Sequence, residues 1–192
     1  MQQAYLQGNS SRNGVIVPMT SASPARNIRA IRRSLLIAIA FIAAAPAYAN
    51  TARQPESEAR NEAIVREAFA GWAAGRSSVF DILSGDIRWT IRGSGPVADT
   101  YRGIEDFLNR GATPLVSRLA TPLQPVVHHI WAVGDRVIIR FDASATTTSG
   151  APYRNQFVWI FRMHDGSVAE AEAFLDLVAY QQVIDNNEPR QQ

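Results

Sequence analysis

Three short turns divide the second half of the chain into stretches of alternating apolar and polar residues, and this pattern constrains the fold most strongly. The turns Gly134-Asp135, Ser149-Gly150 and Asp165-Gly166 separate QPVVHHIWAV, RVIIRFDASATTT, PYRNQFVWIFRM and SVAEAEAFLDLVAY. Asp/Gly pairs between alternating stretches are typical of β-hairpins. The sequence therefore predicts a run of antiparallel strands from residue 124 to residue 180.

Helical patterns precede these strands. Apolar residues from Ala63 to Trp72 recur at helical spacing and Gly75 follows as a stop, while residues 103–120 form a second helical stretch with a break at Pro114. Helices followed by antiparallel strands predict an α+β domain with its helices on one face of a bent sheet. We expect residues 50–56 to be a linker, residues 57–184 to be the domain, and residues 185–192 to be a flexible tail.

The first 49 residues have the pattern of a secretory signal peptide. Arginines from Arg26 to Arg33 precede an apolar stretch at residues 35–45, and Ala47-Tyr48-Ala49 is a small-residue cleavage motif. The apolar stretch is shorter than the roughly 20 residues that a spanning helix needs, so we expect no stable membrane anchor. We expect Sec-type export to the periplasm or medium with cleavage after Ala49; Met19 is an alternative start.

Charge and composition exclude several functional classes. The chain has a net charge of +2 and a pI near 9.4, but removal of residues 1–49 leaves 14 arginines against 17 acidic residues, a net charge of −3. We therefore expect no nucleic-acid partner. Cysteine is absent, only three histidines are present, and no phosphate-binding, dinucleotide or serine-nucleophile motif occurs. We expect neither a metal nor a cofactor.

Three segments resemble SnoaL-like proteins related to ketosteroid isomerase, in the nuclear transport factor 2-like superfamily. They are WTIRGSGPVADTYRG, GDRVIIRFDASATTTSGAPYRNQFVWIFRMHDG and EAFLDLVAY, and the likeness runs over residues 58–184. The resemblance implies a cone-shaped α+β barrel in which a curved antiparallel sheet wraps the N-terminal helices around one deep apolar pocket. It also implies homodimers through the open sheet face. The superfamily contains isomerases, polyketide cyclases, hydrolases, dehydratases and binding modules, so the fold alone does not determine an activity.

Asp176 is the candidate catalytic residue. It follows the apolar run Ala173-Phe174-Leu175, and apolar surroundings would raise the pKa of its carboxyl toward that of a base able to abstract a proton next to a carbonyl. The resemblance implies the same, because an aspartate at this place is an acid/base group in relatives. The alternative is a strand-end aspartate that accepts bonds from backbone amides or pairs with an arginine. Ala173 stands where relatives often carry a second acidic residue, which argues against a two-carboxylate mechanism.

Several further residues are candidates for the pocket. Period-two alternation places Asn155, Phe157 and Trp159 on one strand face, which suits either a ligand pocket with one orienting amide or a core with one satisfied Asn. Asn155 would either polarise a ligand carbonyl or hold a neighbouring loop. Trp89 is expected to line the pocket, and Tyr101 either donates a phenolic proton or anchors the GSGP loop.

The histidine pair supplies the last candidate. His128 and His129 are consecutive and would face opposite ways on a strand, so that one of them, with His129 as our choice, could enter the pocket.

Three functions remain open: a cofactor-independent isomerase, cyclase or lyase acting on a small hydrophobic carbonyl compound through Asp176, a binding protein with the same pocket, and a dimeric interaction module.

Overall fold

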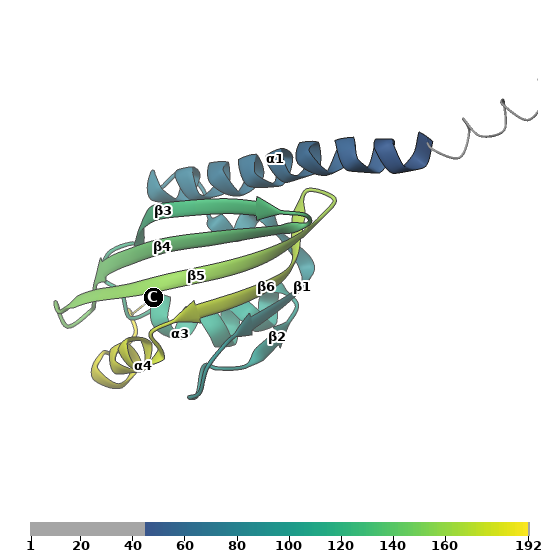
Figure 1. Cartoon of the computed structure of the whole chain (residues 1–192). Helices are drawn as coiled ribbons and strands as arrows, with labels where there is room; N and C mark the ends of the chain where they lie inside the picture. Colours follow the sequence, from purple (N-terminus) through teal and green to yellow (C-terminus); the bar gives the residue numbers. More distant parts are fainter. Residues whose placement is uncertain (1–44, 192) are drawn as a thin grey trace, which may run out of the picture. The chain divides into compact units, whose positions relative to one another are not determined.

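One curved sheet of six strands forms the centre of the protein (Figure 1). A computed structural model describes the backbone of residues 45–191 and the side chains of residues 54–191. The strands are β1 (Leu83–Ile91), β2 (Thr100–Arg102), β3 (Gln124–Val133), β4 (Arg136–Thr146), β5 (Pro152–His164) and β6 (Ser167–Leu175). Their order is β2-β1-β6-β5-β4-β3, so the sheet stays open with β2 and β3 at its edges.

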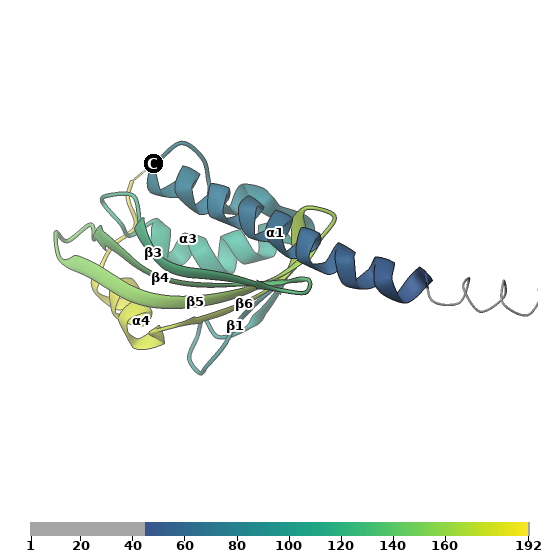
Figure 2. The same cartoon turned by 45° about the horizontal axis from the view of Figure 1, so that its top comes forward.

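The helices gather mainly on one side of this sheet. They are α1 (Ala45–Ala73), the 3₁₀ turn η1 (Val79–Ile82), α2 (Ile104–Asp106), the π-helical turn η2 (Phe107–Ala112), α3 (Thr113–Val116) and α4 (Leu177–Asn186). Figure 2 shows α1 and α3 over the same, concave face of the sheet. This arrangement confirms the predicted α+β class with helices against a bent sheet. Among the helices of the described part, none has both the length and the apolar character to cross a membrane.

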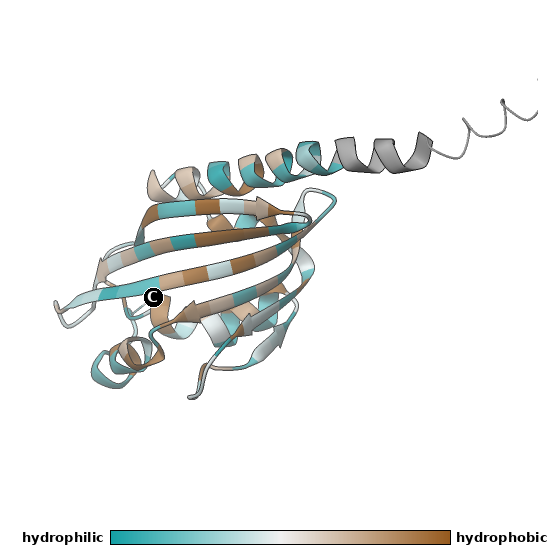
Figure 3. Cartoon of the chain, in the orientation of Figure 1, coloured by the Kyte–Doolittle hydropathy of each residue, from teal (hydrophilic) through white to brown (hydrophobic). Residues whose placement is uncertain are grey.

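The hairpins form where the turn residues predicted them. Asp165 and Gly166 have φ angles of 48° and 82°, which are the left-handed values that a tight two-residue hairpin needs. Strand β4 pairs antiparallel with β5 along its whole length, from Arg136 opposite Arg162 to Thr146 opposite Pro152. Hydrophobic and hydrophilic residues alternate along β3, β4 and β5 (Figure 3). One set of side chains enters the core and the other set lies on the outer face.

Aromatic side chains dominate the core between α1 and the sheet. Phe69 of α1 is 1% exposed and packs edge-on against Phe141 and Trp159, with ring centroids 5.0 and 5.7 Å away. Phe141 in turn stacks on Phe157 at 4.7 Å. These contacts attach the helix to β4 and β5 and fix one wall of the concave space.

The pairing of β1 and the structure of the segment after β6 differ from what the sequence predicts. Strand β1 pairs with β6 in parallel, whereas we expected antiparallel strands throughout. The last part of the closing stretch is not strand, because the chain leaves β6 at Leu175 and begins α4 at Leu177. Both outcomes depend on contacts between distant segments, which local alternation does not encode.

The two ends of the domain also differ from what the sequence predicts. Residues 50–56, expected as a linker, lie inside α1 although Pro55 removes one helical hydrogen bond. Several hydrogen bonds hold the expected tail in place; among them, Arg190 N donates to Ser117 O at 2.8 Å and Arg118 Nε donates to Asn187 O at 2.8 Å. Residues 1–44, and with them most of the expected export signal, lie outside the described residues.

Candidate functional site

An apolar cavity of about 360 Å³ lies between the concave face of the sheet and the helices. This volume falls in the range of small-molecule sites in proteins, roughly 300–1,000 Å³. The lining residues are Trp72, Ser77, Ser78, Val79, Phe80, Trp89, Ile91, Phe107, Gly111, Ala112, Leu115, Val116, Pro122, Leu123, Phe157, Trp159, Ala173, Leu175 and Tyr180. Ser77, Ser78, Val116 and Pro122 are exposed and therefore mark the place where the cavity meets solvent.

Three aromatic rings of this wall pack tightly on one another. Trp89 of β1 stands edge-to-face to Trp159 of β5, with centroids 5.0 Å apart and planes at 86°. Phe107 stacks on the other side of Trp89 at 4.1 Å. Trp89 and Trp159 are 1% and 6% exposed, so both rings are almost fully buried in this apolar wall. Such a surface suits a flat apolar molecule.

The π-helical turn η2 shapes the opposite wall. A Cβ atom at Gly111 would lie 2.9 Å from Phe107 Cδ2 and 3.2 Å from Tyr101 Cε2, so only glycine fits without displacing these rings. Tyr180 of α4 donates its hydroxyl hydrogen to Gly111 O at 3.2 Å. Burial raises the pKa of the Tyr180 hydroxyl well above its ordinary value, which keeps it protonated. Through Tyr180, helix α4 thereby forms part of the cavity wall next to the end of β6.

The cavity offers no strong acid or base. None of its lining residues is a carboxylate, a histidine or an arginine. Ser78 caps η1 by accepting a hydrogen bond from Phe80 N at 3.1 Å. The indole Nε1 of Trp89 is buried and has no hydrogen-bond partner among the described residues. The arrangement can hold an apolar molecule, and its lining contains the hydroxyl groups of Ser77, Ser78 and Tyr180 but no carboxylate or imidazole.

Asp176 lies away from this cavity, as the N-cap of α4. Its Oδ1 accepts hydrogen bonds from Val178 N at 2.9 Å and Ala179 N at 3.0 Å, and the residue is exposed. The expected apolar surroundings are therefore not present around its carboxylate. Of the two interpretations in the sequence, the structure shows the aspartate bonded to backbone amides.

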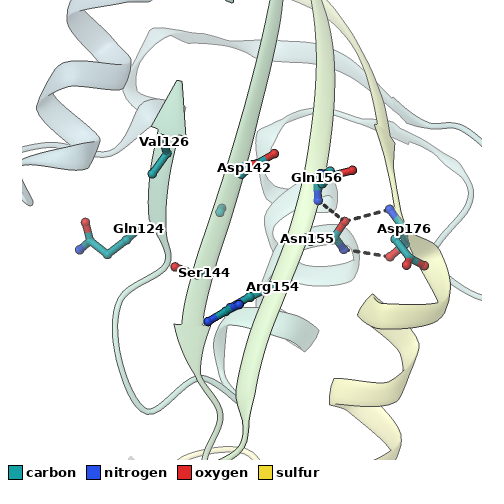
Figure 4. Close-up of a pocket in the computed structure, with 9 residues that line it drawn as sticks. Gln124, Val126, Asp142, Ser144, Arg154, Asn155, Gln156 and Asp176 are labelled. Carbon is teal, nitrogen blue, oxygen red and sulfur yellow. Dashed lines mark hydrogen bonds between the residues drawn. The ribbon is translucent and has the colours of Figure 1, made fainter. Parts of the chain in front are cut away.

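Asn155 holds the segment that leads into this cap (Figure 4). Its Nδ2 donates to Asp176 O and to Tyr153 Oη, both at 2.9 Å, and its Oδ1 accepts from Asp176 N at 2.9 Å and Gln156 N at 2.8 Å. Both ends of the amide are thus occupied by protein groups. Burial raises the pKa of the neighbouring Tyr153 to about 12. In this arrangement Asn155 connects β5 to the start of α4 and does not line the apolar cavity.

Asp176 and Asn155 line a separate polar groove of about 540 Å³ that runs over the outer face of the sheet. Figure 4 shows the side chains around it, from β3, β4, β5 and the start of α4. They are Gln124, Val126, Asp142, Ala143, Ser144, Arg154, Asn155, Gln156 and Asp176. Asn155 alternates on the same face of β5 as Phe157 and Trp159, but it lies nearer the start of the strand. None of the residues that line the groove lines the apolar cavity, so the residues expected to act together belong to two different hollows.

Tyr101 and His129 line neither hollow. The Tyr101 hydroxyl donates to Val97 O at 2.7 Å, which makes this residue the anchor of the GSGP loop, and burial raises its pKa. A β-bulge at His128 changes the expected alternation, because Val127 pairs with Phe141 while His129 pairs with Arg140. Both histidines therefore lie exposed on the outer face, His129 stacked on Trp131 at 4.9 Å.

His128 contacts a carboxylate at the surface. His128 Nε2 lies 2.9 Å from Asp142 Oδ2, and Arg140 donates to the other oxygen of the same carboxylate. The hydrogen bond from Arg140, and next that from His128, lowers the pKa of Asp142. Within residues 54–191 no three acidic or histidine side chains gather as a metal site.

Of the predicted site residues, Trp89, Phe157 and Trp159 reach the apolar cavity. Sequence reasoning missed most of its other wall residues, among them Phe80, Phe107, Leu115 and Tyr180. The helical stretch at residues 103–120 contained a usable signal, since its apolar residues had to face the sheet. The contribution of Tyr180 had no such signal, because its segment was expected to be strand.

Comparison with known proteins identifies the family and supports the fold. A family model described as SnoaL-like domain matches residues 65–171, just over half of the chain. No curated relative matches the chain.

Three solved structures, all under 25% identical, share the fold. Bal32a, from a soil-derived mobile gene cassette, has 18% identity and a TM-score of 0.56, with 66% of this chain and 98% of the other covered. A candidate SnoaL-like polyketide cyclase from Jannaschia sp. CCS1 has 23% identity and a TM-score of 0.52, with 68% and 95% covered. AclR, a candidate hydroxylase from Streptomyces galilaeus, has 22% identity and a TM-score of 0.52, with 65% and 98% covered.

Proposed function

Because the chain belongs to the SnoaL-like domain family, we propose that it is an exported binding protein for a small hydrophobic molecule with a carbonyl group. The observation that carries this proposal is the apolar cavity, which is lined by aromatic and aliphatic side chains and contains no carboxylate, histidine or arginine. Proton transfer needs a group of suitable pKa within hydrogen-bond reach of the substrate. Binding without turnover therefore fits the cavity better than acid–base catalysis.

The expected affinity is moderate. A tricyclic ligand of about 14 non-hydrogen atoms, gaining about 0.4 kcal/mol per atom, would bind with roughly 5.6 kcal/mol. That free energy corresponds to a dissociation constant of roughly 0.1 mM for a simple probe, and a natural ligand of better fit would bind more tightly.

Cavity-filling variants test the binding proposal. Ala173 of β6 is 2% exposed and lines the cavity, so Ala173→Leu should lower the affinity for the neutral probe fluorene at least tenfold. The matched control is Ala169→Leu on the same strand, because Ala169 is half-buried and does not line the cavity. Equilibrium dialysis measures both affinities, and native mass spectrometry of the purified protein detects a retained natural ligand. Equal affinity for fluorene in both variants would rule out the cavity as the binding site.

A second candidate function is the isomerase-like or cyclase-like chemistry through Asp176. It is favoured by the position of Asp176 in the segment EAFLDLVAY, and two of the similar structures are named as a candidate cyclase and a candidate hydroxylase. Catalysis predicts that the protein exchanges the α-hydrogens of a bound ketone with deuterated solvent and that Asp176→Asn loses this exchange. Pure binding predicts no exchange above the solvent background in either protein.

Export and dimer formation complete the proposal. The charged segment before the apolar stretch at residues 35–45 supports export, and the mass of the protein recovered from the periplasm should correspond to a chain that begins at Asn50.

The outer sheet face supports a homodimer, because Val126, Trp131 and Phe174 are 59%, 48% and 43% exposed on it. Trp131→Glu should reduce the dimer fraction in analytical ultracentrifugation, whereas His164→Glu, at the exposed end of β5, should not.

A further inference from the structure

Residues 187–190, which we call the tail segment, are attached next to the mouth of the cavity. None of their side chains is buried. Arg190 N nevertheless donates to Ser117 O, and Arg118 Nε donates to Asn187 O, both at 2.8 Å. Ser117 and Arg118 directly follow α3, the helix whose last residue lies on the exposed rim of the cavity. The tail segment therefore holds an element that borders the cavity mouth.

Helix α3 has only 4 residues and takes partners for its carbonyl groups from outside. The last carbonyl groups of a helix have no partner within that helix. Arg118 Nη1 donates to Pro114 O at 2.8 Å, and Arg190 Nη2 donates to Val116 O at 3.5 Å. Arginine side chains at this end of a helix can satisfy its last carbonyl groups. The two arginines thus act together as the C-terminal cap of α3.

The tail segment is also bonded to the turn between β4 and β5. Thr148 Oγ1 donates to Glu188 O at 2.8 Å, and Ser149 N donates to Asn187 Oδ1 at 3.1 Å. Thr148 N donates to Arg118 O at 2.9 Å. Arg118 consequently connects three parts of the protein, which are α3, the tail segment and this turn.

Two residues of α3 belong to the cavity. Leu115 is 6% exposed and forms part of the wall, whereas Val116 is 42% exposed and lies at the mouth. The aromatic wall of Trp89 and Trp159 comes from β1 and β5 instead. A shift of α3 would therefore move one side of the mouth and leave the aromatic wall in place.

The attachment of the tail segment has the character of a contact that opens locally. Ordering one residue of backbone costs about as much free energy as one hydrogen bond contributes. The tail segment adds no buried apolar side chain to this balance. Segments held mainly by exposed hydrogen bonds open at a much lower free energy than the core does. The tail segment can thus detach while the sheet stays folded.

We infer that the tail segment is a latch on the cavity mouth, and that Arg118 is the positioning residue through which the latch holds α3. When the tail segment detaches, α3 loses its cap and moves, and a ligand enters or leaves past Val116. This inference rests on the proposed binding function and adds control of ligand exchange to it. The latch changes the association and dissociation rates together, because the aromatic wall that contacts the ligand stays the same.

Removal of the latch tests this inference through the rate of ligand exchange. The probe is fluorenone, the ketone analogue of fluorene, which quenches the fluorescence of the cavity tryptophans when it binds beside them. In stopped-flow dilution, a chain that ends at Asn186 should release fluorenone about fivefold faster than the unaltered protein, because opening no longer breaks the hydrogen bonds of the tail segment. The dissociation constants from equilibrium dialysis should agree within about twofold.

Point variants separate the latch from a general loss of stability. Arg118→Ala should speed release as truncation does, and the two changes together should add little, because both break the same connection. Arg118→Lys should restore part of the slow release, since lysine can donate to either Asn187 O or Pro114 O. Thr148→Ala removes one exposed bond to the tail segment and should speed release about twofold. The control Arg162→Ala removes a hydrogen-bonded arginine on the outer face and should leave the rate unchanged.

The outcomes distinguish the latch from the binding function. Equal release rates in the unaltered protein, the truncated chain and Thr148→Ala would overturn the latch and leave the binding function intact. A folded, truncated protein that binds fluorenone much more weakly at an unchanged association rate would also overturn it, because the tail segment would then form part of the binding wall. If fluorenone does not bind the unaltered protein, the binding function itself fails, and the inference fails with it.

Discussion

Replacement of Asn155 by alanine should destabilise the protein without changing its affinity for a ketone ligand. The side chain is 5% exposed and makes four hydrogen bonds of 2.8–2.9 Å, two of them to the backbone of Asp176. At a net contribution of about 0.5–1.5 kcal/mol per bond, the loss would be roughly 2–6 kcal/mol. Because Asp176 is exposed, water can replace part of this bonding, and we expect about 3 kcal/mol.

The assay is thermal unfolding followed by circular dichroism. For a domain of this size, a loss of about 3 kcal/mol lowers Tm by roughly 6–12 °C. Gln156→Ala is the matched control, since that side chain points outward from the same strand and is exposed, and its effect should stay within about 0.5 kcal/mol. Asn155→Asp tests the two donor bonds separately, because a carboxylate can accept from the two amides but cannot donate to Asp176 O or Tyr153 Oη.

Two results would refute this reasoning. A fall in Tm below about 2 °C for Asn155→Ala would show that the four bonds do not hold β5 to α4. A folded Asn155→Ala protein that binds fluorenone, a ketone of the shape of fluorene, at least tenfold more weakly than the wild-type protein does would show that the amide polarises a ligand carbonyl, the alternative role that the sequence left open.

Three further predictions concern stability. The pKa of Glu170 is lowered to about 2, first by the hydrogen bond from Arg162 and then by that from Arg88. The contribution of Glu170 to the free energy of unfolding is therefore present above about pH 4.5 and is lost as the pH falls toward 2. The three side chains are 30–52% exposed, so Glu170→Gln should lower the free energy of unfolding in urea by at most about 1 kcal/mol at pH 6 and by almost nothing at pH 2. An equal loss at both pH values would show that the arginine partners do not lower the pKa of Glu170. Asp176→Ala should cost about 1 kcal/mol through loss of the α4 cap, whereas Asp176→Asn, which retains a capping oxygen, should change the free energy of unfolding by only a few tenths. Phe69→Ala should cost about 3–5 kcal/mol in the same assay because it leaves a cavity between α1 and the sheet, and a loss below about 1 kcal/mol would mean that the helix does not depend on this ring.

The hairpins and the aromatic face of β5 could be predicted because both follow from local patterns. The turn Asp165-Gly166 carries the residues that left-handed backbone angles require, and Phe157 and Trp159 alternate with outward residues. The same rule failed at His128 and His129, where a bulge inserts one extra residue and places both side chains outside. Nothing in the neighbouring residues indicated the bulge, which depends on the pairing of β3 with β4.

The sequence alone predicted the fold class, the placing of helices before the strands β3 to β6, and the family. These are properties of periodicity and of turn residues, which act within a few positions of the chain. Tertiary contacts determined which partners each polar residue meets. Asp176 became the N-cap of α4, and Asn155 bonds the backbone of this cap, because both outcomes depend on how the chain leaves β6 and returns beside β5.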